Sequence, residues 1–215
     1  MVDIVITNPP FGGMEEDGIE NNFPKKYQTR ETADLFLALI MHMLKPDTGR
    51  AAIILPDGFL FGEGVKTTIK RELLTEFNLH TIIRLPKGVF SPYTGINTNI
   101  LFFEKGEPTK KIWFFEHPYP EGYKSYSRSN PLTIAEFDLE KRWWTNRKNT
   151  EYSWMVSVKE IEAKNYNLDF KNPLVVDIDL GDPDKLIQEY EDISKQLIAT
   201  REALKNELMQ ALGDK

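Results

Sequence analysis

Short apolar runs that alternate with helical patterns constrain the fold of this chain more than any other feature of its sequence. Apolar runs of strand length occupy residues 2–7, 51–55 and 80–85. Between them, apolar residues recur at helical spacing over 32–44 and 66–77. Strands that alternate with helices indicate a parallel sheet with helical crossovers, and continuous apolar runs suit strands that are covered on both faces. We therefore predict an α/β fold.

One further strand departs from this alternation. Residues 98–104 form another apolar run, but the segment between them and the strand ending at Leu85 has no room for a crossover helix. The two strands are therefore predicted to pair antiparallel, with the second strand at an edge of the sheet.

The sequence Asn8-Pro9-Pro10-Phe11 directly follows the first predicted strand. In open α/β sheets, ligands bind beyond the carboxyl ends of the strands, which is where these residues fall. Asn8 offers a side-chain carbonyl, Pro9 offers a backbone carbonyl held by its fixed φ, and Phe11 offers a ring for stacking. This combination suits a nucleobase that has left the duplex and whose exocyclic amine needs two hydrogen-bond acceptors. The alternative is a turn that merely ends the strand.

Several blocks of the sequence resemble the methylation (M) subunit of type I restriction-modification systems, in the N6-adenine branch of the amino-group DNA methyltransferases. The blocks keep that family's order from residue 2 to about residue 170. They are Asp3 to Gly12, Gly49 to Phe61, Leu85 to Phe90, Tyr93 to Phe103, Trp154 to Val156, and Lys164 to Asp169.

This resemblance implies a partial class I, Rossmann-like methyltransferase sheet with an antiparallel edge strand. It also implies a site-specific DNA adenine-N6 methyltransferase subunit that uses S-adenosylmethionine. The catalytic residues that match the family motif are Asn8, Pro9, Pro10 and Phe11. The implied partners are double-stranded DNA and the specificity and restriction subunits of a type I system.

The loop over residues 12–30 is long enough to be functional. In the family that the chain resembles, this loop lies beside the flipped base. The resemblance therefore implies that Lys25, Lys26 and Arg30 contact DNA phosphates. The alternative is a solvated cluster of charges.

A glycine-rich turn that cradles S-adenosylmethionine precedes the Asn-Pro-Pro-Phe motif in that family. The glycines present here lack a strand-turn-helix nucleotide fingerprint, so no cofactor-binding residue can be named. We expect the chain to be the C-terminal portion of an M subunit, truncated before that turn. The alternative function is a catalytically inactive remnant that binds DNA or the specificity subunit. In that family another strand pairs with the strand that precedes the motif. Without that partner, the strand at 2–7 would have a bare edge, through which self-association is expected.

Composition narrows the class of protein further. The chain has no cysteine, and its three histidines are scattered without a ligand spacing, so no metal site is predicted. Neither a signal peptide nor an apolar stretch long enough to span a bilayer is visible. These features favour a cytoplasmic protein with no membrane role.

The net charge of −6 is unusual for a protein that binds nucleic acid. Residues 105–150 are an exception, because basic residues outnumber acidic ones there and aromatic residues are interleaved with them. This stretch either contacts DNA or a partner subunit, or it is a folded extension whose aromatic residues supply its core.

Three portions of the chain are expected. Residues 1–120 would form the C-terminal half of the catalytic domain, and 121–170 an aromatic and basic extension. Residues 171–215 would contain a linker and an amphipathic helix, with Asp182 or Asp184 as its N-cap and Pro183 in its first turn. That helix would dock on a partner, which by family analogy is the specificity subunit, or fold back on its own domain.

Overall fold

The structure is a computed structural model that describes the backbone of residues 1–174 and 183–213. It describes the side chains of the same residues except 183–186, 189, 206 and 210–213. The chain divides into two compact units, Met1–Leu174 and Val175–Lys215. Each unit is described by itself.

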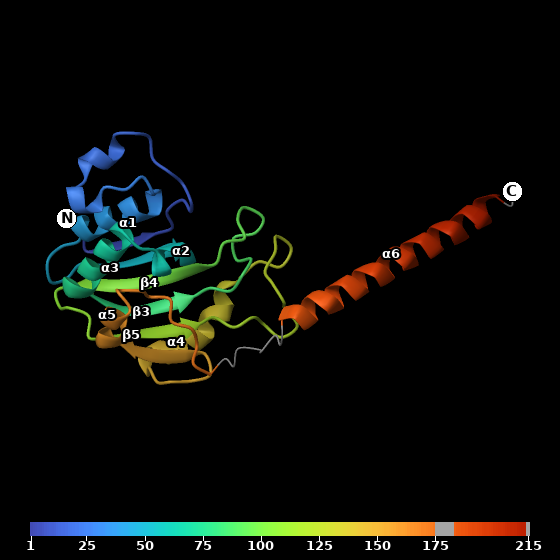
Figure 1. Ribbon diagram of the computed structural model, residues 1–215. Coiled ribbons are helices and arrows are strands. Elements are labelled where there is room, and N and C mark those ends of the chain that lie inside the picture. Colours follow the sequence, from blue (N-terminus) through green and yellow to red (C-terminus); the bar gives the residue numbers. More distant parts are fainter. Residues whose placement is uncertain (175–182, 214–215) are drawn as a thin grey trace. The chain divides into compact units, whose positions relative to one another are not determined.

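A single six-stranded sheet organises the first unit (Figure 1). The strand order is β1-β2-β4-β3-β5-β6. Two pairs are parallel, β1 with β2 and β3 with β5, while β4 runs antiparallel to both of its neighbours and β6 runs antiparallel to β5. The strands are β1 (Ile4–Thr7), β2 (Arg50–Pro56), β3 (Phe77–Arg84), β4 (Thr98–Lys105), β5 (Lys111–Glu116) and β6 (Ser153–Ser157).

This sheet, with its connecting helices, confirms the α/β prediction and corrects two details of it. β4 pairs antiparallel with β3 as predicted, but it lies between β2 and β3 instead of at an edge. The antiparallel strand at the far edge is β6. In addition, Phe77 does not end a helix: it begins β3, and its side chain is buried in the core.

Four helices and one face of the sheet enclose the main core. They are α1 (Thr32–Met43), α2 (Asp57–Phe61), α3 (Val65–Thr75) and α5 (Val158–Ala163). Side chains on a strand alternate between faces, so Ile82 and Phe114 point into this core while the next residues point away from it. Helix α1 keeps its predicted position, and Leu37 and Ile40 on it are buried.

The opposite face of the sheet carries a smaller core. Ile83 and Phe115 pack there with Trp143 from α4 (Asp138–Thr145), which follows a short 3-10 turn, η3 (Ile134–Phe137). Aromatic residues of the predicted basic extension therefore contribute to the core, and β6 extends the same sheet. This face is open near β1, where the side chains of Ile4 and Ile6 are 52% and 81% exposed.

β1 lies at one edge of the sheet and pairs only with β2 among the described strands. Self-association through this edge stays a prediction.

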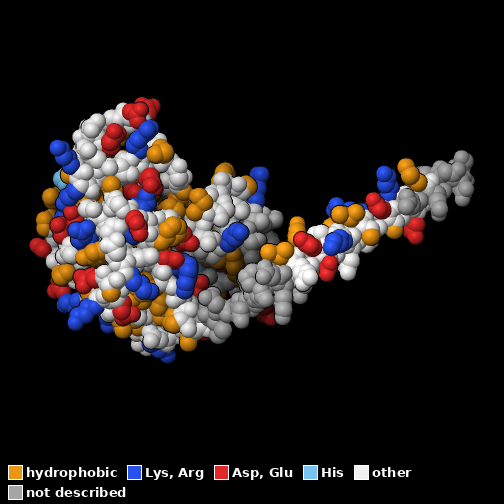
Figure 2. All heavy atoms as spheres, in the orientation of Figure 1, with side chains coloured by type: hydrophobic (Ala, Val, Ile, Leu, Met, Phe, Trp, Pro, Cys, Tyr) orange, Lys and Arg blue, Asp and Glu red, His pale blue; other side chains and the backbone are white. Residues whose placement is uncertain are grey.

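The described part of the second unit is one helix, α6 (Pro183–Gly213). Five apolar residues on it are exposed: Tyr190, Ile193, Leu197, Leu204 and Leu208. The space-filling view in Figure 2 shows apolar and charged side chains mixed along it. Of the predicted caps, Asp182 lies outside the described residues, and Pro183 and Asp184 lie outside those with described side chains. No described helix is long and apolar enough to cross a membrane.

Candidate functional site

The predicted catalytic residues lie at the carboxyl edge of the sheet, where β1, β2 and β3 end and β4 begins. Asn8-Pro9-Pro10-Phe11 leaves β1 at this edge, beside the end of β2. The Asn8 side chain is exposed and has no hydrogen bond to another described residue, whereas Pro9 is buried. Asn8 is therefore anchored by its rigid neighbour and keeps its carboxamide available for a ligand.

An aromatic contact at this edge connects the segment after β1 with the loop after β3. The rings of Phe11 and Phe90 meet edge to face, with centroids 5.1 Å apart and an interplanar angle of 76°. Phe90 belongs to the loop between β3 and β4. β2 and β4 lie between β1 and β3 in the sheet. Because neighbouring strands are about 4.8 Å apart, β1 and β3 are separated by roughly 14 Å, and the contact between the two rings spans the ends of β2 and β4. The sequence motifs had not singled out Phe90 as a site residue.

Contacts at the base of the loop fix its two ends together. The Thr32 backbone N–H donates to the Gly13 carbonyl at 3.0 Å, and Glu15 N–H donates to the Arg30 carbonyl at 2.8 Å. A Cβ at Gly13 would lie 2.9 Å from Thr32 Oγ1, so this close approach needs glycine. The loop after the motif is therefore closed onto the start of α1.

A charged cluster supports that end of α1. Lys66 Nζ lies 2.5 Å from Glu31 Oε1 and 2.9 Å from Asp34 Oδ2, and Asp34 is only 1% exposed. Burial raises the pKa of Asp34, although Lys66 opposes the shift. The cluster lines a cavity of about 470 Å³ that also borders Gly12 and Gly13. It ties α3 to the loop that follows the motif.

A buried lysine holds the connection between α2 and α3. Lys70 Nζ donates to the carbonyls of Leu60 and Gly62, both at 2.8 Å. Burial lowers the pKa of Lys70 to about 8, with a smaller contribution from the charge of Lys66. A cation at this position satisfies carbonyls that the short helix α2 leaves open at its C-terminus.

An ion-pair network joins the end of β3 to the segment after α5. Arg84 Nη1 lies 2.7 Å from Asp169 Oδ1 and donates to the Phe170 carbonyl at 3.1 Å. Its other terminal nitrogen lies 3.8 Å from Asp57 Oδ1, which also accepts a 2.6 Å hydrogen bond from Asn99. Burial alone would raise the pKa of Asp169, but the bonds from Arg84 and Lys171 hold it below its ordinary value. The network links four segments at the carboxyl edge.

The predicted DNA-contacting residues are exposed, but two of them already have partners. Lys26 Nζ lies 2.6 Å from Glu72 Oε1, and Arg30 lies 2.7 Å from Asp17 Oδ1. Lys25 makes no ion pair with a described residue. Contact of these three residues with DNA stays a prediction.

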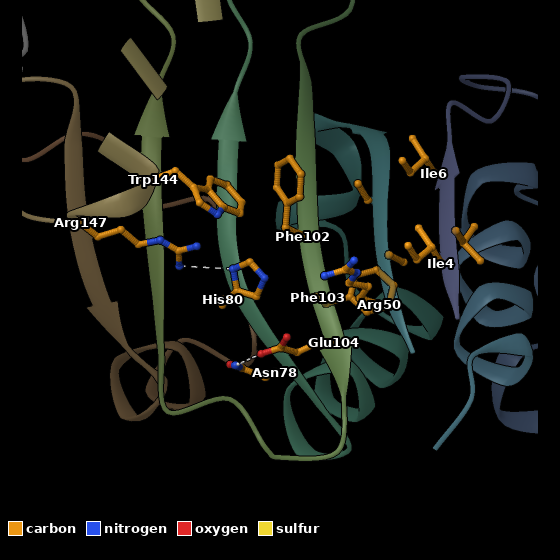
Figure 3. A pocket seen from close by; sticks show the side chains of 13 residues that line it. Ile4, Ile6, Arg50, Asn78, His80, Phe102, Phe103, Glu104, Trp144 and Arg147 are labelled. Carbon is orange, nitrogen blue, oxygen red and sulfur yellow. Dashed lines mark hydrogen bonds between the residues drawn. The ribbon is translucent and has the colours of Figure 1, made fainter. Parts of the chain in front are cut away.

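A second concave surface, of about 600 Å³, lies on the open face of the sheet (Figure 3). Arg147 lies over Trp144, 4.4 Å from the ring centroid, and its Nη1 is 3.3 Å from His80 Nδ1. Burial, together with the charge of Arg147, lowers the pKa of His80 to about 4, so this imidazole is neutral near pH 7. None of the residues from Asn8 to Phe11 lines this surface.

Neither a metal nor a nucleotide site is evident in the described part of the chain. The described residues contain no group of three or more histidine or acidic side chains that could hold a metal ion. Gly12 and Gly13 follow β1, but two 3-10 turns and a further loop, not a long helix, come next. The glycine-rich turns of P-loop and Rossmann nucleotide sites open a helix directly, so Gly12 and Gly13 do not form a turn of that kind.

Comparison with known proteins gives consistent matches. The family model described as N-6 DNA Methylase matches residues 1–177. The chain is 55% identical to the type I restriction enzyme EcoEI methylase subunit of Escherichia coli, over 99% of this chain and 44% of that protein. It is 32% identical to the EcoKI methylase subunit of Escherichia coli strain K12, over 74% of this chain and 32% of that protein.

Solved structures agree with these matches. A modification subunit of a putative type I restriction enzyme from Vibrio vulnificus superimposes with a TM-score of 0.78 and 47% identity, over 83% of this chain and 40% of that one. A chain from a study of complex assembly in a type I restriction-modification system gives 0.76 and 37%, over 97% of this chain and 45% of that one. The chain therefore spans less than half the length of these relatives.

Proposed function

Because the chain belongs to the N-6 DNA methylase family, we propose that it is part of the methylation subunit of a type I restriction-modification system, an S-adenosylmethionine-dependent DNA adenine-N6 methyltransferase. The main structural support for placing the adenine site at this motif is the ring contact between Phe11 and Phe90. The exposed Asn8 carboxamide, which has no hydrogen bond to a described residue, lies in the same motif. An aromatic wall next to a free acceptor suits an extruded adenine.

Each residue of the motif has a distinct role in this proposal. The N6 amine of adenine is a weak nucleophile because its lone pair is delocalised into the ring. The side-chain carbonyl of Asn8 and the backbone carbonyl of Pro9 would each accept one N6–H, which leaves the lone pair directed at the methyl donor. Pro10 restricts the backbone of Pro9 and so fixes the direction of its carbonyl. Phe11 would stack on the base, and Phe90 would support it from the side.

S-adenosylmethionine would supply an electrophilic methyl group on a positively charged sulfur. The described residues do not by themselves fit this cofactor, since Gly12 and Gly13 do not open a helix and β1 pairs on one side only. Within the described residues, the groups assigned to the reaction are those of the motif, which would hold the base and its amine.

The proposal extends to partners. Double-stranded DNA would be the substrate, and the specificity and restriction subunits of a type I system would be bound proteins. Support comes from the similarity to a chain from a study of complex assembly in a type I restriction-modification system and from the exposed apolar residues of α6. Lys25, Lys26 and Arg30 are proposed as weaker phosphate contacts, because Lys26 and Arg30 would first have to give up their carboxylate partners.

Methyl transfer to a DNA duplex tests this function. The chain is assayed alone and together with a polypeptide that supplies the part of the EcoEI methylase subunit that it does not cover, and the product nucleosides are separated. We expect N6-methyladenine from the combined proteins. Asn8→Ala should lower the rate by about 100-fold or more, the typical cost of removing one preorganised hydrogen-bonding group. Binding of S-adenosylmethionine by the combined proteins, measured by calorimetry, should not change.

Two results would overturn the proposal. Methylation by Asn8→Ala at the wild-type rate would show that the Asn8 carboxamide does not hold the adenine amine. Absence of methylation in both arrangements, with DNA binding intact, would support a binding module that has no catalytic activity.

A further inference from the structure

Two loops that leave neighbouring strands at the carboxyl edge form a continuous surface. Residues 85–97 connect β3 to β4, and residues 117–133 follow β5 (Figure 1). β3 and β5 are parallel neighbours, and the His117 N–H donates to the Arg84 carbonyl at 3.0 Å where the two strands end. We call residues 85–97 and 117–133 the two-loop surface.

Close backbone contacts hold the two loops together. Gly88 has a φ of +87°, and a Cβ there would lie 2.5 Å from the Tyr126 carbonyl oxygen. The Tyr119 hydroxyl donates to the Lys87 carbonyl at 3.0 Å. Tyr126 is 2% exposed, and its hydroxyl donates to Glu136 at 2.5 Å. The surface is therefore built before any ligand arrives, which lowers the entropy that binding would cost.

The charge of this surface is opposite to that of the chain as a whole. It carries Lys87, Lys124 and Arg128 but only one carboxylate, Glu121, whereas the whole chain has a net charge of −6. The three cations are exposed, and none makes an ion pair with a described residue. Tyr93, in the first loop, is 93% exposed.

The loop on the other side of the proposed base site has the opposite balance. Residues 12–31 contain five carboxylates and three cations, and Lys26 and Arg30 are paired with carboxylates. Phe90 belongs to the two-loop surface and contacts Phe11, so the basic surface borders the proposed base site directly. A polyanion that reaches this site is therefore attracted more strongly by the two-loop surface than by the loop over residues 12–31.

We propose that the two-loop surface is the main phosphate-contacting surface of this chain for duplex DNA, through Lys87, Lys124 and Arg128. The inference rests on the proposed function, because duplex DNA is the polyanion that an adenine site would receive. An acidic segment of a partner protein is the competing occupant. The exposed aromatic residues and the adjacent base site favour DNA.

The salt dependence of DNA binding tests this inference. The full chain and its variants bind a fluorescent duplex of about three helical turns, and the affinity is measured by anisotropy at several KCl concentrations. Each phosphate contact that is lost should lower the slope of log K against log [KCl] by about 0.9. A variant with Lys87→Gln, Lys124→Gln and Arg128→Gln should therefore lose about 2 to 3 from this slope.

A matched control removes three cations at the opposite edge. Arg50 begins β2, Lys111 begins β5 and Lys159 follows β6, so all three lie where the parallel strands begin. All three are exposed, and none makes an ion pair with a described residue. Their replacement by Gln changes the net charge equally and should leave the slope within about 0.5 of the wild-type value. The variant Lys25→Gln, Lys26→Gln, Arg30→Gln should lose about 1 at most, because Lys26 and Arg30 are already paired.

The outcomes separate this inference from the proposed function. An unchanged slope in the two-loop variant, an equal loss in the control, or no salt-dependent binding by the wild-type chain would overturn the inference. Because this readout needs no methyl transfer, a wild-type slope together with Asn8-dependent methylation would remove the inference and leave the function standing. Absence of methylation, together with the expected loss of slope in the two-loop variant, would remove the proposed function and leave the phosphate-contacting surface standing.

Discussion

The ion pair between Arg84 and Asp169 should be one of the strongest couplings at the carboxyl edge. The atoms are 2.7 Å apart, and the two side chains are 10% and 20% exposed. Removing one partner of a buried pair costs about 3–5 kcal/mol, because the other charge stays buried without a counterion. Asp169 retains some solvent and has Lys171 Nζ at 3.0 Å, so Asp169→Asn should cost less than this range, about 2 kcal/mol.

Replacing the arginine should cost more. Arg84→Gln leaves both Asp57 and Asp169 without their shared cation, and we expect a loss of about 3 kcal/mol. In the double variant the Arg84–Asp169 ion pair is already broken by the first substitution, so the second substitution should cost less than it does in the wild type. The double-mutant cycle should therefore give a coupling energy of about 1.5 kcal/mol. For a unit of this size, a loss of 2 kcal/mol corresponds to a decrease in Tm of roughly 4–8 °C.

Urea unfolding provides the assay, with tryptophan fluorescence as the signal. Trp154 is buried and stacks on Phe114 at 5.5 Å, so its emission should report unfolding of the first unit. Because the pKa of Asp169 is lower in the folded state than its ordinary value of 3.8, the stabilisation is present above that value. It should be lost as the pH falls through the folded pKa, and the wild type and Asp169→Asn should then converge. Additive single effects, or a difference that does not change with pH, would refute this account.

Two further predictions concern other parts of the chain. In an NMR titration, the imidazole of His80 should titrate near pH 4, and Arg147→Gln should raise that pKa by removing the neighbouring charge; an ordinary value near 6.5 would show that the imidazole is solvated. Deleting residues 184–215 should abolish co-purification with a specificity subunit while the urea midpoint of Met1–Leu174 stays unchanged, since that unit has its own core. Unaltered co-purification would show that the specificity subunit binds outside residues 184–215.

The parts of the fold that the sequence predicts are those determined by local pattern. The helix over residues 32–44 and the strand over 51–55 were predictable because apolar spacing and a following proline or glycine determine them. The place of Asn8 to Phe11 at a strand end follows from the same local information. β5 and β6 were not predictable, because aromatic runs such as 113–115 suit an extension's core as well as a strand.

The parts of the site that the sequence does not predict depend on contacts between distant segments. The Phe11–Phe90 contact requires two loops from strands that are not neighbours, and no spacing in the sequence encodes it. The aromatic that follows the strand end in Leu85 to Phe90 was a signal that could have suggested it. Similarly, the pairing of Lys26 with Glu72 joins a loop to α3, so a charge cluster that looked available for phosphate already has a partner.

The position of β4 between β2 and β3 has a consequence for how proteins with this sheet could diversify. The loop over residues 85–97 leaves and re-enters the sheet through adjacent antiparallel strands, and Leu85 N–H donates to the Thr98 carbonyl at 2.9 Å where the loop closes. Residues inserted or deleted between these positions would leave the strand register unchanged, because the closing hydrogen bond is made outside them. A lineage could therefore alter the length of this loop in small steps, and with it the extent of the two-loop surface, without changing the sheet.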